Sequence, residues 1–136
     1  MTMTVAGSKD TNDQQGSIRA LFDDWNNALQ TQNPAEVVTL YAADAILLPT
    51  VSNKVRRTPA EIEDYFIDFL ARGPSGAINE SDVRTFGDIA IHSGIYTFSF
   101  SDASRVQARF TFVYHWNGTL WQIIEHHSSK MPETSV

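Results

Sequence analysis

The feature that constrains this chain most is a change in the spacing of its apolar residues near residue 77. Before that point, apolar residues recur every three or four positions, as they do on one face of an α-helix. After it they alternate with polar residues, as in half-buried β-strands. Helices followed by a run of consecutive strands favour an α+β fold, in which the helices cover one face of an antiparallel sheet.

Three helices are predicted before the change. An apolar stripe with helical spacing indicates the first. The second and third begin at Asn33–Glu36 and Thr58–Glu61, because each segment combines a capping side chain, a proline in the first turn and an acidic residue. A short buried strand, Ala45–Leu48, lies between them and stops at Pro49. The stripe of the first helix comprises Ile18, Leu21, Phe22, Trp25, Ala28 and Leu29.

Four strands are predicted after the change, at about 77–86, 89–100, 105–116 and 119–129. The dipeptide Asn117-Gly118 between the last two is typical of a two-residue hairpin turn. The predicted order is therefore α-α-β-α-β-β-β-β, within a single domain of residues 14–130. We expect residues 1–13 to be a flexible leader and residues 131–136 a polar tail.

Composition excludes several classes of function. Ten basic against sixteen acidic residues give a formal net charge of −6, which disfavours binding to nucleic acid. The chain has no cysteine, so disulfides, thiolate metal sites and thiol nucleophiles are excluded. Its apolar stretches are far shorter than the ~20 residues of a membrane helix. We expect a cytoplasmic protein without a membrane partner and without a cofactor.

The two-residue turn fixes a register for the last two strands. It pairs Phe110 with Glu125 and Ala108 with His127, so both titratable residues point to the aromatic face beneath the helices. Glu125 and His127 are then either an acid/base pair acting on a small organic molecule or a hydrogen-bonded structural pair. The side chains expected to line the same pocket are Trp25, Tyr41, Tyr65, Phe112 and Tyr114.

The same register places Arg109 and His126 on the opposite face, with Tyr96 nearby. This face is either a dimer surface or a solvated one. Adjacent residues of a strand point to opposite faces, so His126 and His127 do not bind one ion and no metal site is expected. Arg56, in a small basic cluster before the third helix, is either an anion contact at the pocket mouth or part of a solvated loop.

The order of elements resembles the nuclear transport factor 2-like superfamily, in which a curved antiparallel sheet wraps a long helix to form a cone. Within it, the chain is most similar to the association (hub) domain of calcium/calmodulin-dependent kinase II and to its stand-alone bacterial relatives. The resemblance covers about residues 16–132. The segments that carry it are Leu21–Leu29, Leu40–Ala45, Pro49–Lys54, Phe112–Gly118 and Trp121–Ser129.

The resemblance implies a homodimer through the sheet, a ring of dimers as the larger assembly, and a pocket for a small organic ligand. We expect no kinase activity of this chain, because its 136 residues contain no glycine-rich phosphate loop and are too few for a kinase fold. Two arginines of the hub pocket correspond to Phe112 and Ser128 in this chain. The alternative function is a small-molecule enzyme of the SnoaL-like isomerase or hydrolase type, using Glu125 and His127.

Overall fold

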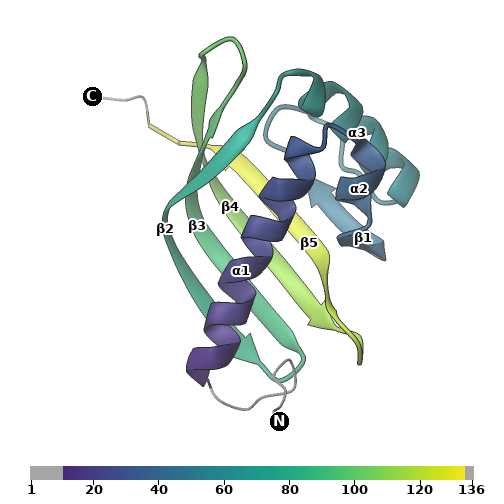
Figure 1. The fold of residues 1–136 in the computed structure, drawn as a ribbon, viewed down its shortest axis with the longest axis vertical. Helices are drawn as coiled ribbons and strands as arrows, with labels where there is room; N and C mark the ends of the chain where they lie inside the picture. The colour runs from purple at the N-terminus through teal and green to yellow at the C-terminus, as the bar shows by residue number, and fades with distance from the viewer. Residues whose placement is uncertain (1–10, 134–136) are drawn as a thin grey trace.

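The structure is a computed structural model that describes residues 11–133. Its elements follow the predicted order (Figure 1). The residues expected to form the leader and the tail lie mainly outside the described range, although the first helix already begins at Thr11. The elements are α1 (Thr11–Gln30), α2 (Pro34–Val38), β1 (Tyr41–Leu48), α3 (Pro59–Ala71), β2 (Ser75–Phe86), β3 (Ile89–Ser99), β4 (Arg105–Trp116) and β5 (Trp121–Lys130).

Helices α2 and α3 begin where the capping motifs predict. The Asn33 side chain accepts a hydrogen bond from the Ala35 amide, and the Thr58 side chain accepts one from the Glu61 amide. Helix α2 ends at Val38. The Leu40 carbonyl already accepts a hydrogen bond from the Ile123 amide of β5.

The five strands form one curved sheet in the order β1-β5-β4-β3-β2. Strand β1 runs parallel to β5, and the other neighbours are antiparallel. All three helices lie on the same face, with α1 crossing the concave side (Figure 1). We call this the inner face and the uncovered side the outer face.

The core lies between α1, α3 and the inner face, and most of its large side chains are aromatic. Trp25 of α1 is at its centre and is 1% exposed. Its ring lies 5.5 Å from the ring of Phe112 on β4 and 6.4 Å from that of Phe66 on α3. The apolar stripe of α1 therefore packs against the inward-facing apolar side chains of the strands, as predicted.

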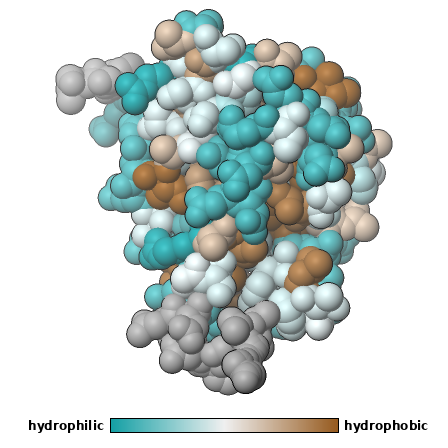
Figure 2. Space-filling view, in the orientation of Figure 1, coloured by the Kyte–Doolittle hydropathy of each residue, from teal (hydrophilic) through white to brown (hydrophobic). Residues whose placement is uncertain are grey.

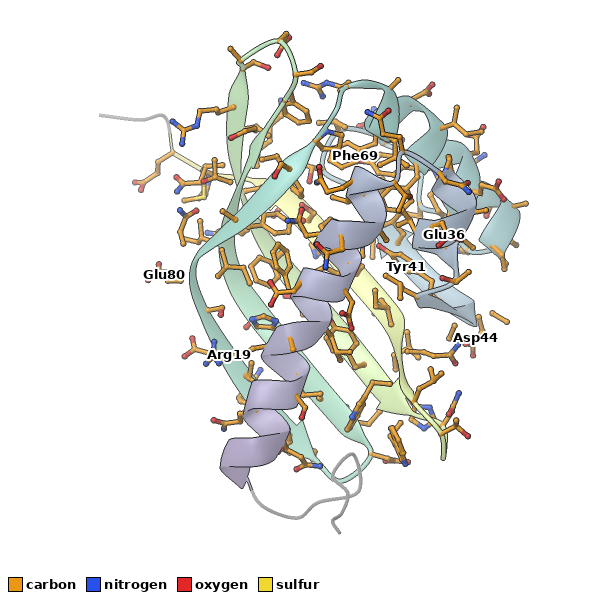
Figure 3. The ribbon with its side chains drawn as sticks, in the orientation of Figure 1. Arg19, Glu36, Tyr41, Asp44, Phe69 and Glu80 are labelled. Carbon is orange, nitrogen blue, oxygen red and sulfur yellow. The ribbon has the colours of Figure 1, made fainter. Side chains whose placement is uncertain are left out.

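Polar side chains of α1 cover the open edge of β2. The Asn26 side chain accepts a hydrogen bond from the Gly76 amide, and Gln30 and Gln15 donate to the carbonyls of Pro74 and Val83. Arg19 reaches from α1 toward the same strand and donates to the Ser81 hydroxyl (Figure 3). The edge that a second chain could extend is thereby blocked by the protein's own helix.

The prediction of a two-residue turn between β4 and β5 is wrong. Residues 117–120 form a longer loop, in which the Asn117 side chain accepts hydrogen bonds from the amides of Thr119 and Leu120. Trp116 therefore pairs with Trp121, and the strands are shifted by two residues from the predicted register. A shift of two leaves each side chain on its expected face.

A β-bulge then reverses the faces of the rest of β5. Tyr114 pairs with Ile123 but Val113 pairs with Glu125, so Ile124 is an extra residue in the strand. Beyond the bulge, His126 lies opposite Phe112 on the inner face. Glu125 and His127 point to the outer face and are exposed.

Candidate functional site

A chain of buried hydrogen bonds links α1, β1 and β5. The Trp25 Nε1 donates to the Tyr41 hydroxyl over 3.1 Å, and that hydroxyl lies 2.8 Å from Nδ1 of His126. Tyr41, at the start of β1, is directed inward between the helices and the sheet, whereas Asp44 points away from the domain (Figure 3). The β1 strand thus brings a polar atom into an aromatic core.

The chain continues from His126 toward the loop after β1. The Tyr96 hydroxyl lies 3.3 Å from Nε2 of His126 and donates to the Ser128 hydroxyl over 2.7 Å. Ser128 in turn is hydrogen-bonded to Thr50. Six side chains from α1, β1, β3, β5 and one loop therefore form a continuous network.

The donors and acceptors assign a direction to this network. An indole N–H can only donate, so the Tyr41 oxygen accepts from Trp25 and its own proton goes to His126 Nδ1. Nε2 of His126 then carries the ring proton and donates to Tyr96, which donates to Ser128. Every buried proton has an acceptor, and the last hydroxyl, that of Thr50, lies at the half-buried end of the chain.

Burial keeps the groups of this network neutral. The apolar surroundings lower the pKa of His126 to about 3, with a smaller contribution from nearby His127. Burial also raises the pKa of Tyr41 and that of Tyr96 well above the ordinary value. His126 is therefore an uncharged hydrogen-bonding group at neutral pH, with both ring nitrogens engaged.

The interior of the cone leaves little free space. A cavity of about 20 Å³ lies beside the network, lined on its polar side by Thr50, Tyr96, His126 and Ser128. This volume is enough for about one water molecule. The aromatic rings that were expected to line a ligand pocket fill most of the space instead.

A larger cleft of about 230 Å³ opens on the outside of the same wall. Tyr65 and Phe69 of α3 line both the cleft and the cavity, so the two spaces are neighbours. In Figure 3, Phe69 lies where α3 approaches the upper end of α1. The cleft is lined by Val51, Ser52, Arg56, Tyr65, Asp68, Phe69 and Arg72.

The predicted pocket residues are therefore only partly brought together. Trp25 and Tyr65 line the cavity, and Arg56 and Tyr65 line the cleft. The remaining predicted ligand residues, Tyr41, Phe112 and Tyr114, are packed in the core and line neither space.

The structure corrects the placement of four other predicted residues. Glu125 and His127 lie on the outer face, apart from the cavity and the cleft, because of the bulge at Ile124. His126 and Tyr96, expected at a dimer surface, are 3% and 1% exposed on the inner face. Tyr96 pairs with Ala108, whose side chain is directed toward the helices.

Several polar residues of the site were not predicted from the sequence. Thr50 and Ser128 end the buried network, and Ser52, Asp68 and Arg72 line the cleft. One signal was available for Ser128: Ile123-Ile124 interrupts the polar–apolar alternation of β5, as a bulge does, and every later residue of the strand then changes face.

The outer face is the one large surface of the sheet that the helices leave uncovered in the described part of the chain (Figure 1). Arg109 lies on this face as predicted, opposite Ile95 of β3 and Ser129 of β5. The apolar side chains of this face are half-buried, as are Ser93 and Thr111 in its middle row, while Arg109, Glu125 and His127 are exposed. Its apolar members are Ile46, Leu48, Ile89, Ile91, Ile95 and Val113.

The helix-covered side of the molecule is more hydrophilic than the outer face along α1. Hydrophilic side chains dominate the ridge formed by α1, and hydrophobic side chains show mainly along its flanks (Figure 2). Among the described residues, no helix is long and apolar enough to cross a bilayer, and no group of three or more metal-ligating side chains occurs.

Comparison with solved structures defines the class of fold. A protein with a nuclear transport factor 2-like fold from Pseudomonas putida is 18% identical, with a TM-score of 0.77 over 88% of this chain and 87% of its own. A nuclear transport factor 2-like superfamily protein from Salmonella enterica is 14% identical, with a TM-score of 0.77 over 93% of this chain and 96% of its own. The fold is therefore nuclear transport factor 2-like, as the sequence predicts.

The family within this class follows from the sequence match. Residues 14–132 match the family described as the calcium/calmodulin dependent protein kinase II association domain. A Xanthomonas campestris structure named for the same domain is 47% identical, with a TM-score of 0.85 over 98% of this chain and 97% of its own. No curated protein matches this chain. The chain belongs to the calcium/calmodulin dependent protein kinase II association domain family.

Proposed function

We propose that this chain is a self-association domain, which forms at least a homodimer through the outer face of its sheet. The observation that carries this proposal is the uncovered sheet face itself. Part of it is apolar, with Ile91 of β3 directly paired with Val113 of β4. The chain's own helices all lie on the other side. Membership of an association domain family supports the same function.

The outer face has the make-up of an interface between identical chains. Exposed charges of both signs accompany its apolar residues: Asp82 and Arg84 lie on β2, Arg109 on β4 and Glu125 on β5. Specific interfaces combine apolar contacts with polar and charged ones. In a twofold dimer each patch meets its own copy, so a surface with both signs of charge can pair with itself.

The alternative, acid/base chemistry by Glu125 and His127, has no support in this geometry. Both side chains face away from the cavity and the cleft. The buried His126 has a low pKa and both ring nitrogens hydrogen-bonded, so it is a poor proton acceptor near neutral pH.

The proposal is tested by placing a charge in the centre of the outer face. Val113→Arg is expected to weaken self-association at least about tenfold, because the guanidinium loses water in the interface without a partner. Arg109→Glu, at an exposed position of the same face, is expected to weaken it less. The measurement is sedimentation velocity over a range of protein concentrations.

Asn27→Arg is the matched control, because it adds the same charge at an exposed position of α1 on the opposite side of the domain. It is expected to sediment like the wild-type protein. Circular dichroism verifies that each variant is folded. A Val113→Arg protein that is folded and retains the wild-type assembly mass would refute the proposal.

A further inference from the structure

We infer that the groove between helix α1 and strand β2 binds a free amino acid with an apolar side chain. Arg19 and Ser81 bind its carboxylate, Asp23 binds its ammonium group, and the apolar part of the wall contacts its side chain. The groove has a volume of about 450 Å³ and shares no residue with the cleft beside α3. Four residues of α1, four of β2 and His92 of β3 line it.

The strand pairing places Ser81 and His92 next to each other beneath α1. Ser81 pairs with Gly94, and Val83 pairs with His92, so the side chains of Ser81 and His92 lie on the same, inner face. Nε2 of His92 is 2.9 Å from the Ser81 hydroxyl oxygen. Gly94 leaves room for this contact, because a Cβ atom there would lie 2.8 Å from the Cβ of Ser81.

Arg19 of α1 contacts the same hydroxyl from the other wall of the groove. Its Nη1 donates to the Ser81 oxygen over 3.0 Å, and its side chain lies on the side of α1 that faces β2 (Figure 3). Burial, with a smaller contribution from the charge of Arg19, lowers the pKa of His92 to about 4. His92 is therefore neutral at pH 7 and carries one ring proton.

The hydrogen bonds around the Ser81 hydroxyl leave its own proton without an acceptor. Nδ1 of His92 is buried and has no hydrogen-bond partner among the described residues. Buried N–H groups without an acceptor are rarer than buried acceptors without a donor, so the ring proton is assigned to Nε2. The Ser81 oxygen then accepts from both His92 and Arg19, which occupies both of its lone pairs. A ligand oxygen in the groove supplies the acceptor that the Ser81 proton lacks.

Two exposed charges of opposite sign line the groove on α1. Arg19 and Asp23 are one helical turn apart, so their side chains are neighbours on the helix surface. Neither forms a salt bridge with another side chain that the structure describes. An α-amino acid carries its carboxylate and its ammonium group on the same carbon, so it can pair with both residues at once. A simple carboxylate is repelled by Asp23, and the groove therefore favours a zwitterion.

The remaining wall indicates an apolar side chain of limited size. Phe22 of α1, which belongs to the core, and the half-buried Ile78 of β2 line this part of the groove. Asn26 is held in place, because its side chain accepts a hydrogen bond from the Gly76 amide. The volume of about 450 Å³ lies in the lower part of the range for small-molecule pockets, which suits a single amino acid.

The test is a titration with L-leucine at pH 7, followed by amide chemical shifts and by calorimetry. Wild-type protein is expected to bind L-leucine in the millimolar range or tighter, with shifts confined to residues around the groove. Two matched probes each lack one charge: 4-methylpentanoate has no ammonium group, and 3-methylbutylamine has no carboxylate. Both are expected to bind at least about fivefold more weakly than L-leucine.

Three variants separate the contributions of the binding groups. Arg19→Gln is expected to weaken L-leucine binding about fivefold, because it removes the charge that pairs with the carboxylate. Asp23→Asn is expected to weaken L-leucine binding by a similar factor but to tighten 4-methylpentanoate binding about twofold, because it removes a repulsive charge. Ser81→Ala is expected to weaken both carboxylate-bearing probes and to leave 3-methylbutylamine unchanged.

Two control variants test whether binding depends on the groove. Asp24→Asn removes an exposed charge of α1 that does not line the groove, and it leaves L-leucine affinity unchanged. Val113→Arg, on the outer face, binds L-leucine as the wild type does even when self-association is lost.

Any of three results overturns the inference: no L-leucine binding at millimolar concentrations, chemical shifts centred away from the groove, or an Asp23→Asn variant that changes the affinities for L-leucine and 4-methylpentanoate in the same direction.

Discussion

Two buried tyrosines of the inner face differ in what their hydroxyl groups contact. The Tyr41 hydroxyl accepts from Trp25 and donates to His126, so it joins two parts of the buried network. The Tyr114 hydroxyl is equally buried but has no hydrogen-bond partner among the described residues. The two side chains are therefore a matched pair for measuring what the network contributes to stability.

Tyr41→Phe is expected to lower the free energy of unfolding by about 2–4 kcal/mol, because it leaves a buried indole N–H and a buried imidazole nitrogen unpaired. Tyr114→Phe is expected to change it by less than about 0.5 kcal/mol or to raise it, since it removes a hydroxyl that is already unpaired. Urea unfolding at pH 7 measures both. Equal losses in the two variants would contradict the network.

The low pKa of His126 makes stability depend on pH. The unfolded chain binds a proton with the ordinary histidine pKa of roughly 6.5, whereas the folded protein binds it only near pH 3. Folded and unfolded chains are equally deprotonated above that range, so the effect begins as pH falls below roughly 6.5. Stability then decreases down to about pH 3, by about 2 kcal/mol at pH 5 from this residue alone.

Burial also lowers the pKa of His92, to about 4, so its contribution has the same sign. His126→Gln is expected to be less stable than wild type at pH 7 but to lose less stability between pH 7 and pH 5. His127→Gln, on the exposed outer face, is the control. Urea unfolding at the two pH values gives the slopes, and an unchanged slope in His126→Gln would show that His126 does not cause the pH dependence.

At the scale of elements, two bulges set the details of the sheet. One, in β5, decides which histidine is inside. The other lies in β2 between Ile78 and Glu80, where the backbone of β2 comes close to Gly94 of β3. A Cβ atom at Gly94 would lie 2.1 Å from the Glu80 carbonyl oxygen and 2.7 Å from the Ser81 Cα. Only glycine fits this position without a shift of the backbone.

Gly94→Ala is therefore expected to destabilise the protein by more than about 2 kcal/mol, because the neighbouring backbone must move. Gly16→Ala is the comparison. Gly16 lies in α1 with nothing within 4 Å of an added Cβ, so alanine is expected to stabilise by about 0.5–1 kcal/mol through its higher helix propensity. Thermal unfolding measures both, and a tolerated Gly94→Ala would contradict the observed packing.

Most helices and strands could be predicted from the sequence, but the residues of the candidate site could not. Apolar spacing and capping motifs predicted all three helices and the order of helices and strands along the chain, because those patterns depend on local geometry and on one buried face. The side-chain assignment of β5 failed because one extra residue reverses every later side chain. Thr50 and Arg72 become neighbours of the cavity or the cleft only through tertiary packing, so no local pattern marks them.

For the whole molecule, we propose separate roles for the two faces of the sheet. The inner face is filled by aromatic rings and a neutral hydrogen-bond network, and the cleft opens on the far side of that wall. The outer face is left for a second copy of the chain.

The most direct test of self-association is the native mass of the wild-type protein across a range of micromolar concentrations. One chain has a mass of 15.2 kDa. We expect an assembly of two chains, or a larger assembly containing an even number of chains. A single-chain mass that persists at the highest concentration would contradict the proposed self-association.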